Sequence, residues 1–331
     1  MPELPEVYGY TYVTNREIHG DYLISVEFKS GKYATGGKRT IEHHNDFIQS
    51  FPLRVTEMKN KGKFAWIEFE PTQLNQTEWR LGITFGLEGS LMFYRPEKDK
   101  HLRVIYTFKR HNSEQVYNLY YIDSCNYGNI TLYRSQTELN TKLNTIGHDL
   151  LKTTMTDDQF VELCRKHDTM SFTAFLMNQK YVSGVGNYVK SDTLLLGRIN
   201  PHAKINQLTD GRLKRYYNRC GIYLEFRCYM RVINFSAMMY ISNPQNEQSE
   251  EQVQTIMVKL NQLLTHYTSI MDAELKLTGD DNIFKEPISL YQLIHYHTTY
   301  EDLNGVVYDV VCEKAPVVGG RKTYYVKELV F

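Results

Sequence analysis

Seven short segments rich in β-branched and aromatic residues follow one another between residues 22 and 134, and they constrain the fold more than any other feature. Clusters of glycine, asparagine, lysine and serine separate them, which is the composition of turns. The segments are Tyr22–Phe28, Phe64–Phe69, Ile83–Phe85, Leu91–Tyr94, Val104–Phe108, Val116–Ile122 and Ile130–Tyr133. Many short strands joined by turns predict an antiparallel β-sandwich or barrel. A helix beginning near Pro5 is expected to precede it.

The pattern changes near Ile146 from strands to helices. Thr156 and Gln159 have the spacing of a capping box, and apolar residues at helical spacing follow them. Further helices are expected at 171–178, 187–197, 208–232 and 253–267, with the polar stretch at 242–252 forming a surface loop or insertion. The tail predicts a hairpin made of Val306–Val311, a Gly319-Gly320 turn and Lys322–Val326. A chain of 331 residues is long enough for two domains, and we expect them at 1–146 and 147–331.

Composition excludes several classes of protein. No apolar stretch approaches the roughly 20 residues that cross a bilayer, and the N-terminus lacks the layout of a secretion signal. The 5 cysteines are scattered and form no Cys-x-x-Cys pair. This argues against a disulfide framework and against a thiolate zinc site, and it favours a reducing compartment. We therefore expect an intracellular protein that is not secreted and has no membrane partner.

The net charge of zero means that a nucleic-acid binder of this composition must segregate its charge. Lys59, Lys61 and Lys63 are expected to cluster in one loop, and Arg212–Arg219 contributes four basic residues to one helix. Acidic residues gather elsewhere, as in Glu247–Glu251. Such clusters are more often solvated faces than binding sites, so this signal alone is weak.

The N-terminal heptapeptide Met1–Val7 carries the sharpest chemical signal. Removal of Met1 would expose the secondary amine of Pro2, followed directly by the carboxylate of Glu3. An α-amino group has a pKa of roughly 7.7–8.0, against about 10.4 for lysine, so part of it is nucleophilic at neutral pH. Glu3 could then move the protons that amine attack on carbon requires. The alternative is that Pro2 and Pro5 merely frame the start of an ordinary helix.

A second signal is the turn Gly184-Val185-Gly186-Asn187 between two predicted helices. Its glycines permit a tight, partly left-handed turn, and the amides that open the next helix form an anion site suited to phosphate. Most such turns only connect helices. A nucleotide-binding enzyme built on this turn is a poor alternative, because no strand precedes it and no Lys-Ser/Thr pair follows it.

Six segments in one order resemble the formamidopyrimidine-DNA glycosylase/endonuclease VIII family of base-excision repair enzymes. They are Met1–Val7, Asn60–Phe64, Thr84–Leu91, Asp123–Gly128, Asn178–Pro201 and Gly320–Tyr325. The resemblance implies an α+β fold: an N-terminal antiparallel β-sandwich with a leading helix, then a helical domain with a helix–two-turn–helix. It also implies a terminal β-hairpin, or finger, at about 303–331.

The resemblance implies a bifunctional glycosylase and abasic-site lyase. Pro2 would attack the sugar C1′ of an everted nucleotide and expel the base, and Glu3 would exchange protons with the opening ring. Elimination at the resulting iminium would break the strand, assisted by Lys63. Glu6 would help to position the sugar. Asn187 and Arg321 would hold phosphates, which positions DNA without reading its sequence.

Two further positions match residues that fill the gap left in the duplex. Leu87 occupies the first wedge position, and Tyr127 occupies the aromatic wedge position of a second loop. Cys125 and Asn126 stand where many relatives have arginine, so we expect a weak preference for the opposite base and good activity on single-stranded or open DNA. Asp192 stands where relatives commonly have glutamate.

The finger departs from the zinc-binding pattern of many relatives. Counted from Arg321, the second ligand pair would fall at Val326 and Leu329, which do not bind metal, and the first strand offers Val306 and Asp309. Cys312, His295 and His297 do not complete a closed four-ligand site. We therefore expect a zincless hairpin held by apolar cross-strand pairs, no metal and no cofactor. These departures favour the endonuclease VIII-like branch, which acts on oxidised pyrimidines and further-oxidised guanine.

Two alternatives remain open beside the bifunctional enzyme. One is a non-catalytic damaged-DNA-binding protein that keeps the fold, which would retain Met1 or have a blocked N-terminus. The other is a lyase that opens abasic sites without excising bases. In each case the expected partner is damaged double-stranded DNA, with single-stranded or open DNA as a further substrate, and we expect a monomer.

Overall fold

The computed structural model describes residues 2–34, 36–71, 77–96, 99–151, 155–242, 299–301, 306–314 and 322–329, and the single positions 254, 255, 258, 262 and 265. The chain divides into two compact units, residues 1–145 with 231–255 and residues 146–230 with 256–331. The predicted domain boundary after residue 146 stays a prediction. The described end of the longest helix, α7 (Asp210–Ser242), belongs with the first unit from residue 231 onward. Among the helices of the described part, none is long and apolar enough to span a membrane.

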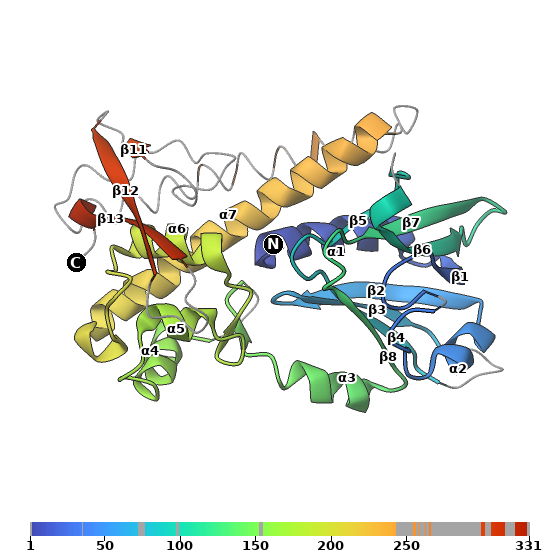
Figure 1. Ribbon diagram of the computed structural model, residues 1–331, viewed down its shortest axis with the longest axis horizontal. Helices are drawn as coiled ribbons and strands as arrows, with labels where there is room; N and C mark the ends of the chain where they lie inside the picture. Colours follow the sequence, from blue (N-terminus) through green and yellow to red (C-terminus); the bar gives the residue numbers. More distant parts are fainter. Residues whose placement is uncertain are drawn as a thin grey trace. The chain divides into compact units, whose positions relative to one another are not determined.

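The first unit is built on one antiparallel sheet of eight strands in the order β5-β7-β6-β1-β2-β3-β4-β8 (Figure 1). The strands are β1 (Tyr22–Phe28), β2 (Leu53–Lys61), β3 (Phe64–Phe69), β4 (Arg80–Thr84), β5 (Ser90–Met92), β6 (Leu102–Lys109), β7 (Val116–Ile122) and β8 (Asn129–Tyr133). β1 pairs with β2 only at Tyr22–Arg54 and Leu23–Leu53. This short pairing joins two halves whose inward side chains share one apolar cluster. The predicted antiparallel sandwich is confirmed.

The prediction that Lys59, Lys61 and Lys63 share one loop is wrong. Lys59 and Lys61 lie in β2, which the sequence analysis missed, and only Lys63 lies in the turn that follows. The strand was hidden because its outward positions are charged. Across the sheet Lys59 Nζ lies 3.0 Å from the Glu68 carboxylate of β3, so this charge is accommodated by cross-strand pairing.

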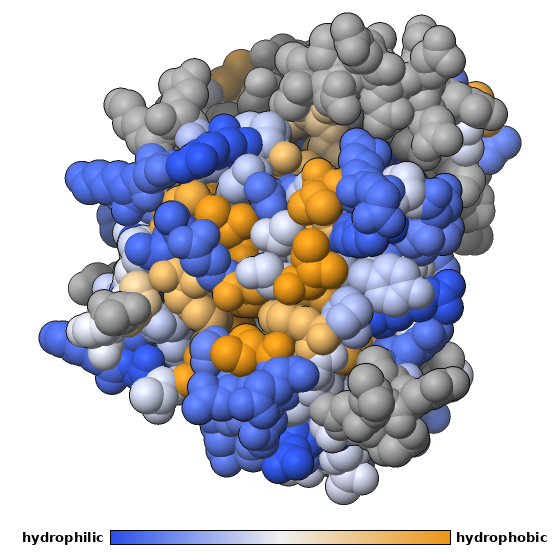
Figure 2. Space-filling model, turned by 90° about the vertical axis from the view of Figure 1, so that its right-hand side faces the viewer, coloured by the Kyte–Doolittle hydropathy of each residue, from blue (hydrophilic) through white to orange (hydrophobic). Residues whose placement is uncertain are grey.

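Within the described residues, three helices belong wholly to the first unit: α1 (Leu4–Ile18), α2 (His44–Gln49) and α3 (Gln136–Leu143), with a 3₁₀ turn η1 (Asp99–His101). α1 begins where the sequence predicted. It buries Leu4, Val7 and Ile18, and it lies against β2, where Met58 N donates to Asn15 Oδ1 at 2.7 Å. Figure 2 shows apolar side chains gathered in the middle of one face, inside a hydrophilic rim.

The second unit contains α4, α5, α6 and the first part of α7, which correspond to helices that the sequence predicted after residue 146. Its elements are β9 (His148–Asp149), α4 (Asp157–Arg165), α5 (Phe172–Met177), β10 (Val182–Ser183), α6 (Asn187–Gly197), η2 (Ile205–Gln207), β11 (Thr299–Glu301), β12 (Val307–Lys314), β13 (Lys322–Val326) and η3 (Lys327–Leu329). The capping box of Thr156 and Gln159 is present at the start of α4. α7 (Asp210–Ser242) runs past the predicted end at 232, and its residues from 231 onward belong to the first unit.

The described strands of the C-terminal hairpin pair in antiparallel register, from Val310–Val326 to Lys314–Lys322. β11 adds a third strand that the sequence analysis did not predict. Val326 and Tyr324 are buried with Leu195 of α6, so the hairpin packs on that helix. The Gly319-Gly320 turn, His295, His297 and most of the predicted 253–267 helix lie outside the described residues, although positions 254, 255, 258, 262 and 265 are helical.

Candidate functional site

Pro2 and Glu3 are buried at the start of α1, directly before its first turn. Glu3 is the N-cap residue, and its backbone N–H donates to Glu6 Oε2 at 2.9 Å. Glu6 Oε1 accepts a second hydrogen bond at 2.7 Å from Arg231 Nε, within the same unit. The helix N-terminus also favours negative charge, so both carboxylates are stabilised there. The arrangement holds Glu3 and the preceding proline in a fixed place.

Arg231 is a residue that sequence reasoning missed. It lies 225 positions from Glu6 along the chain, on the part of α7 that belongs to the first unit. Glu6 is 13% and Arg231 27% exposed, so the pair is largely shielded from water. No local pattern indicates such a long-range pair.

Lys63 is half-buried in the two-residue turn between β2 and β3. Gly62 has a φ of 54°, while Lys63 is outside the positive region, as in a type II′ hairpin turn. Lys61 and Phe64 form the last cross-strand pair before the turn. In Figure 1 this turn and the start of α1 lie at the same end of the first unit.

The two predicted wedge residues lie on adjacent turns and are unusually exposed for their type. Leu87 is 41% and Tyr127 62% exposed. Gly86 has a φ of 61°, and a Cβ atom built there would lie 2.6 Å from Gly128 N and 2.9 Å from Tyr127 Cβ. The two turns therefore touch through their backbones, which brings Leu87 and Tyr127 to one part of the surface.

Asp123 organises the loop that carries Tyr127. Its buried carboxylate accepts hydrogen bonds from Asn126 N at 2.9 Å and from Gly128 N at 2.7 Å. Arg103 Nε donates to Asp123 O at 2.7 Å from β6. Asn126 has a φ of 56°, a conformation that asparagine tolerates better than most residues. The loop therefore presents Tyr127 from a well-bonded backbone.

Two cations flank this loop that the sequence analysis did not single out. Lys32 Nζ and Arg39 Nη1 donate to Asn129 Oδ1 at 3.0 and 3.2 Å. Burial and the nearby Arg39 charge lower the pKa of Lys32 below its ordinary value. The basic run from Lys29 to Arg39 was a signal that could have indicated them. Positive charge beside an exposed aromatic side chain suits a nucleic-acid backbone.

In the second unit, Gln179 holds the turn between α5 and α6. Its side chain donates to Val185 O at 2.8 Å and accepts from Gly184 N at 2.9 Å. Asn187 is the first residue of α6, and its Oδ1 is buried with no hydrogen-bond partner within the described part of the chain. Because a carboxamide presents both donors and an acceptor, this side chain can serve a ligand at the helix N-terminus.

Two hydrogen bonds connect α6 to β13, the strand that follows Arg321. Lys190 Nζ donates to Lys322 O at 3.1 Å, and Tyr324 N donates to Ser191 Oγ at 3.3 Å. Arg321 itself lies outside the described residues. Asp192 is fully buried and accepts a 2.6 Å hydrogen bond from Tyr223 OH, so its role in this helix is structural.

Within the described ranges, no group of three or more histidine, cysteine or acidic residues is arranged to hold a metal ion. Val326, at a predicted ligand position, pairs with Val310 across the hairpin. The zincless finger stays a prediction.

Comparison with known proteins gives a consistent result. Residues 1–130 match the family described as Formamidopyrimidine-DNA glycosylase N-terminal domain. Formamidopyrimidine-DNA glycosylase of Corynebacterium glutamicum (strain R) is 25% identical over 221 residues, covering 65% of this chain and 73% of that protein. The Oceanobacillus iheyensis protein of the same name is 27% identical over 223 residues, covering 65% and 72%.

Among solved structures, Lactococcus lactis formamidopyrimidine-DNA glycosylase bound to DNA with an abasic site aligns with a TM-score of 0.66 at 17% identity, covering 99% of each chain. Its complex with DNA containing an oxidised pyrimidine aligns with the same TM-score at 18% identity, again covering 99% of each chain. The fold is therefore that of a two-unit α+β protein of the glycosylase type. Residues 1–130 thus match the N-terminal domain of formamidopyrimidine-DNA glycosylases, and the whole chain has the fold of these enzymes.

Proposed function

We propose that this protein is a bifunctional DNA glycosylase and abasic-site lyase that removes oxidised bases in base-excision repair. The observation that carries the proposal is the start of α1. There Pro2 and Glu3 are buried, and the Glu6 carboxylate binds both Glu3 N and Arg231. A nucleophile and its proton carrier need this kind of positioning, because a misplacement of about 1 Å can cost about a hundredfold in rate.

The reaction begins once Met1 is removed and Pro2 carries a free secondary amine. The Pro2 nitrogen lone pair attacks C1′ of the everted nucleotide, the base leaves with the electrons of the glycosidic bond, and the proton of the attacking amine passes to the departing base. Glu3 donates a proton to the sugar ring oxygen, the ring opens, and a cationic iminium joins Pro2 to C1′. The iminium acidifies the C2′ hydrogens, so loss of one C2′ proton expels the 3′ phosphate. Loss of a second proton, from C4′ of the unsaturated iminium, then expels the 5′ phosphate. Lys63 assists the proton transfers and contacts phosphate.

The remaining predicted residues hold the DNA. Asn187 and Arg321 bind phosphates around the everted nucleotide, and Leu87 and Tyr127 fill the space that the nucleotide leaves. The adjacency of the Leu87 and Tyr127 turns and the cations Lys32 and Arg39 support this assignment. Relatives of known structure were crystallised with DNA containing an abasic site or an oxidised pyrimidine.

The preferred substrates are those of the endonuclease VIII-like branch, oxidised pyrimidines and further-oxidised guanine. Two features support this: the Cys125-Asn126 pair in the second loop and the apolar Val310–Val326 pair in the hairpin. Without an arginine to contact the orphaned base, the rate should depend little on which base stands opposite the lesion.

Borohydride trapping tests the proposal, because hydride reduces the iminium to a stable amine that links protein to DNA. The protein is incubated with oligonucleotides that carry an oxidised pyrimidine, an oxidised purine or an abasic site. A second preparation carries one extra residue before Pro2. We expect an adduct with the base lesion that is lost in the blocked protein. Trapping only at abasic sites would reduce the function to a lyase, and no adduct from a verified Pro2 terminus would favour a non-catalytic binder.

A further inference from the structure

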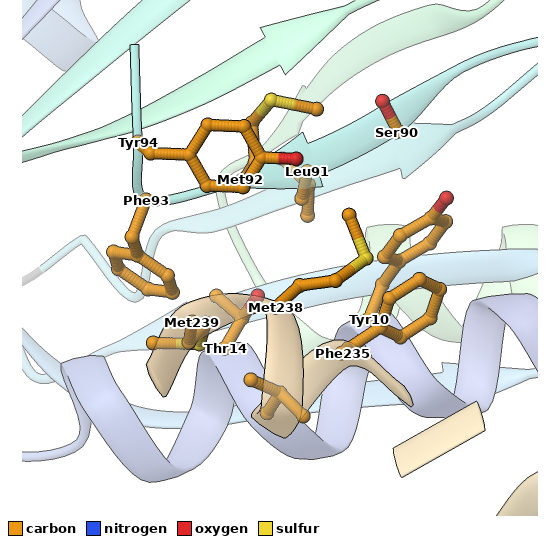
Figure 3. A pocket seen from close by; sticks show the side chains of 11 residues that line it. Tyr10, Thr14, Ser90, Leu91, Met92, Phe93, Tyr94, Phe235, Met238 and Met239 are labelled. Carbon is orange, nitrogen blue, oxygen red and sulfur yellow. The ribbon is translucent and has the colours of Figure 1, made fainter. Parts of the chain in front are cut away.

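A cavity of about 210 Å³ lies in the first unit, and none of the residues assigned to chemistry or to DNA lines it (Figure 3). Three elements form its walls: the middle of α1, the strand β5 with the residues after it, and the end of α7. All of its lining residues are described and belong to one unit. It is therefore an internal feature of that unit.

The lining is apolar and adaptable. Met92, Met238 and Met239 approach from two elements, and the rings of Tyr10, Phe93 and Phe235 supply flat walls. Methionine is flexible and polarizable, and it packs well against aromatic rings. Met238 is 43% exposed, so the cavity is not sealed from solvent on that side. The only polar side-chain groups in the lining are hydroxyls, among them those of Thr14 and Ser90.

The volume and the lining of the cavity together indicate which ligands it can bind. An engineered cavity of about 150 Å³ lined by aliphatic and aromatic side chains stays dry and binds benzene. The present cavity is larger and carries hydroxyls at its wall. We propose that it is a binding site for small planar aromatic molecules of one or two rings that carry at most one hydrogen-bonding group.

A ligand bound in this cavity should stabilise the packing of α1, the helix that directly follows Pro2 and Glu3. Tyr10 stacks on Phe235 with a centroid distance of 4.4 Å and lies 5.2 Å from Phe85, which directly precedes the Leu87 turn. Tyr10 is one helical turn after Glu6, and Phe235 is one turn after Arg231. A ring held in the cavity therefore braces the same α1–α7 contact that the Glu6–Arg231 pair makes. This consequence for activity rests on the proposed function, whereas binding itself does not.

Indole titration of full-length protein labelled with ¹³C at the methionine methyl groups tests the site without DNA. Among the methionine signals, those of Met92, Met238 and Met239 should shift and saturate together. Cross-relaxation from the indole ring protons to these three methyl groups should be observed. Ser90→Phe fills the cavity from β5 and should weaken binding at least tenfold. Ser25→Phe makes the same change at an exposed strand position and should leave binding unchanged.

Saturable shifts confined to other methionines, or no saturable shift, would overturn the proposal, as would equal binding by Ser90→Phe and wild type. Should Ser90→Phe fail to fold, the presence or absence of cross-relaxation in the wild-type protein decides alone. A negative result in the indole titration would not affect the expected outcome of borohydride trapping. Indole binding by a protein that traps no DNA would conversely uphold the cavity and reject the proposed function.

Discussion

Removal of the Arg231 guanidinium should disturb the positions of Pro2 and Glu3 at the start of α1 without unfolding the protein. Two unit charges about 4 Å apart attract by about 4 kcal/mol at an effective dielectric constant of about 20. Desolvation and the ordering of the arginine side chain cancel part of this. The Glu6 and Arg231 side chains are 13% and 27% exposed, and Arg231 Nε lies 2.7 Å from Glu6 Oε1. We therefore expect Arg231→Met to lower the free energy of unfolding by about 2 kcal/mol, within the range of a charged hydrogen bond.

The loss falls on the element that orients Pro2, so the trapping rate should drop by about 30-fold, the equivalent of about 2 kcal/mol. Lys109→Met provides the matched control. It removes an ion pair with Glu114, which is 92% exposed, and should cost under about 1 kcal/mol with no change in trapping. A double-mutant cycle with Glu6→Gln measures the coupling directly. Additive effects of the two substitutions would refute the reasoning, as would an unchanged trapping rate in well-folded Arg231→Met protein.

Three further outcomes are expected. Hydrogen bonds from Tyr117 and His111 and the Arg110 charge outweigh the opposing effect of burial and lower the pKa of Asp21 below its ordinary value. The stability that Asp21 contributes is therefore present above the unfolded pKa of about 3.9 and is lost as the pH falls through the lower folded pKa. In an acid-unfolding titration, Asp21→Asn should lack this loss of stability. An acid-unfolding profile of Asp21→Asn identical to that of the wild type would contradict the prediction. Gly86→Ala forces a side chain into the left-handed region and against Gly128 N, so we expect a loss of about 2 kcal/mol in denaturant unfolding, whereas Gly211→Ala, where a Cβ meets nothing within 4 Å, should not destabilise. Treatment with a strong chelator should leave the thermal midpoint and DNA binding unchanged, and stoichiometric zinc by elemental analysis would reject the zincless finger.

Much of the fold was predictable because its signals are local. β1, β3, β7, α6 and β13 match their predicted bounds residue for residue. Alternation with period two, helical spacing and capping residues act over a few positions, so one sequence contains them. β2 was missed because cross-strand partners, among them Glu68, offset charges that make the segment look like a loop.

The residues of the candidate site likewise divide into those with a local sequence signal and those that only long-range contacts distinguish. Pro2, Glu3, Lys63, Leu87, Tyr127 and Asn187 were identified from short motifs, and their assignment as functional residues stays a proposal. Lys32, Arg39 and Arg231 were not identified, because what distinguishes each of them is a contact with a residue distant in the sequence.

By itself the sequence determined the strands and helices that carry strong local patterns, the family resemblance and the chemical identity of the terminal amine and its carboxylates. Only the tertiary structure decided that Arg231 binds Glu6, that the Leu87 and Tyr127 turns touch, and that α1, β5 and α7 enclose an apolar cavity. The physical reason is that secondary structure responds to neighbours within one or two turns. Pairing of charges and shapes between distant segments, by contrast, depends on how the whole unit packs.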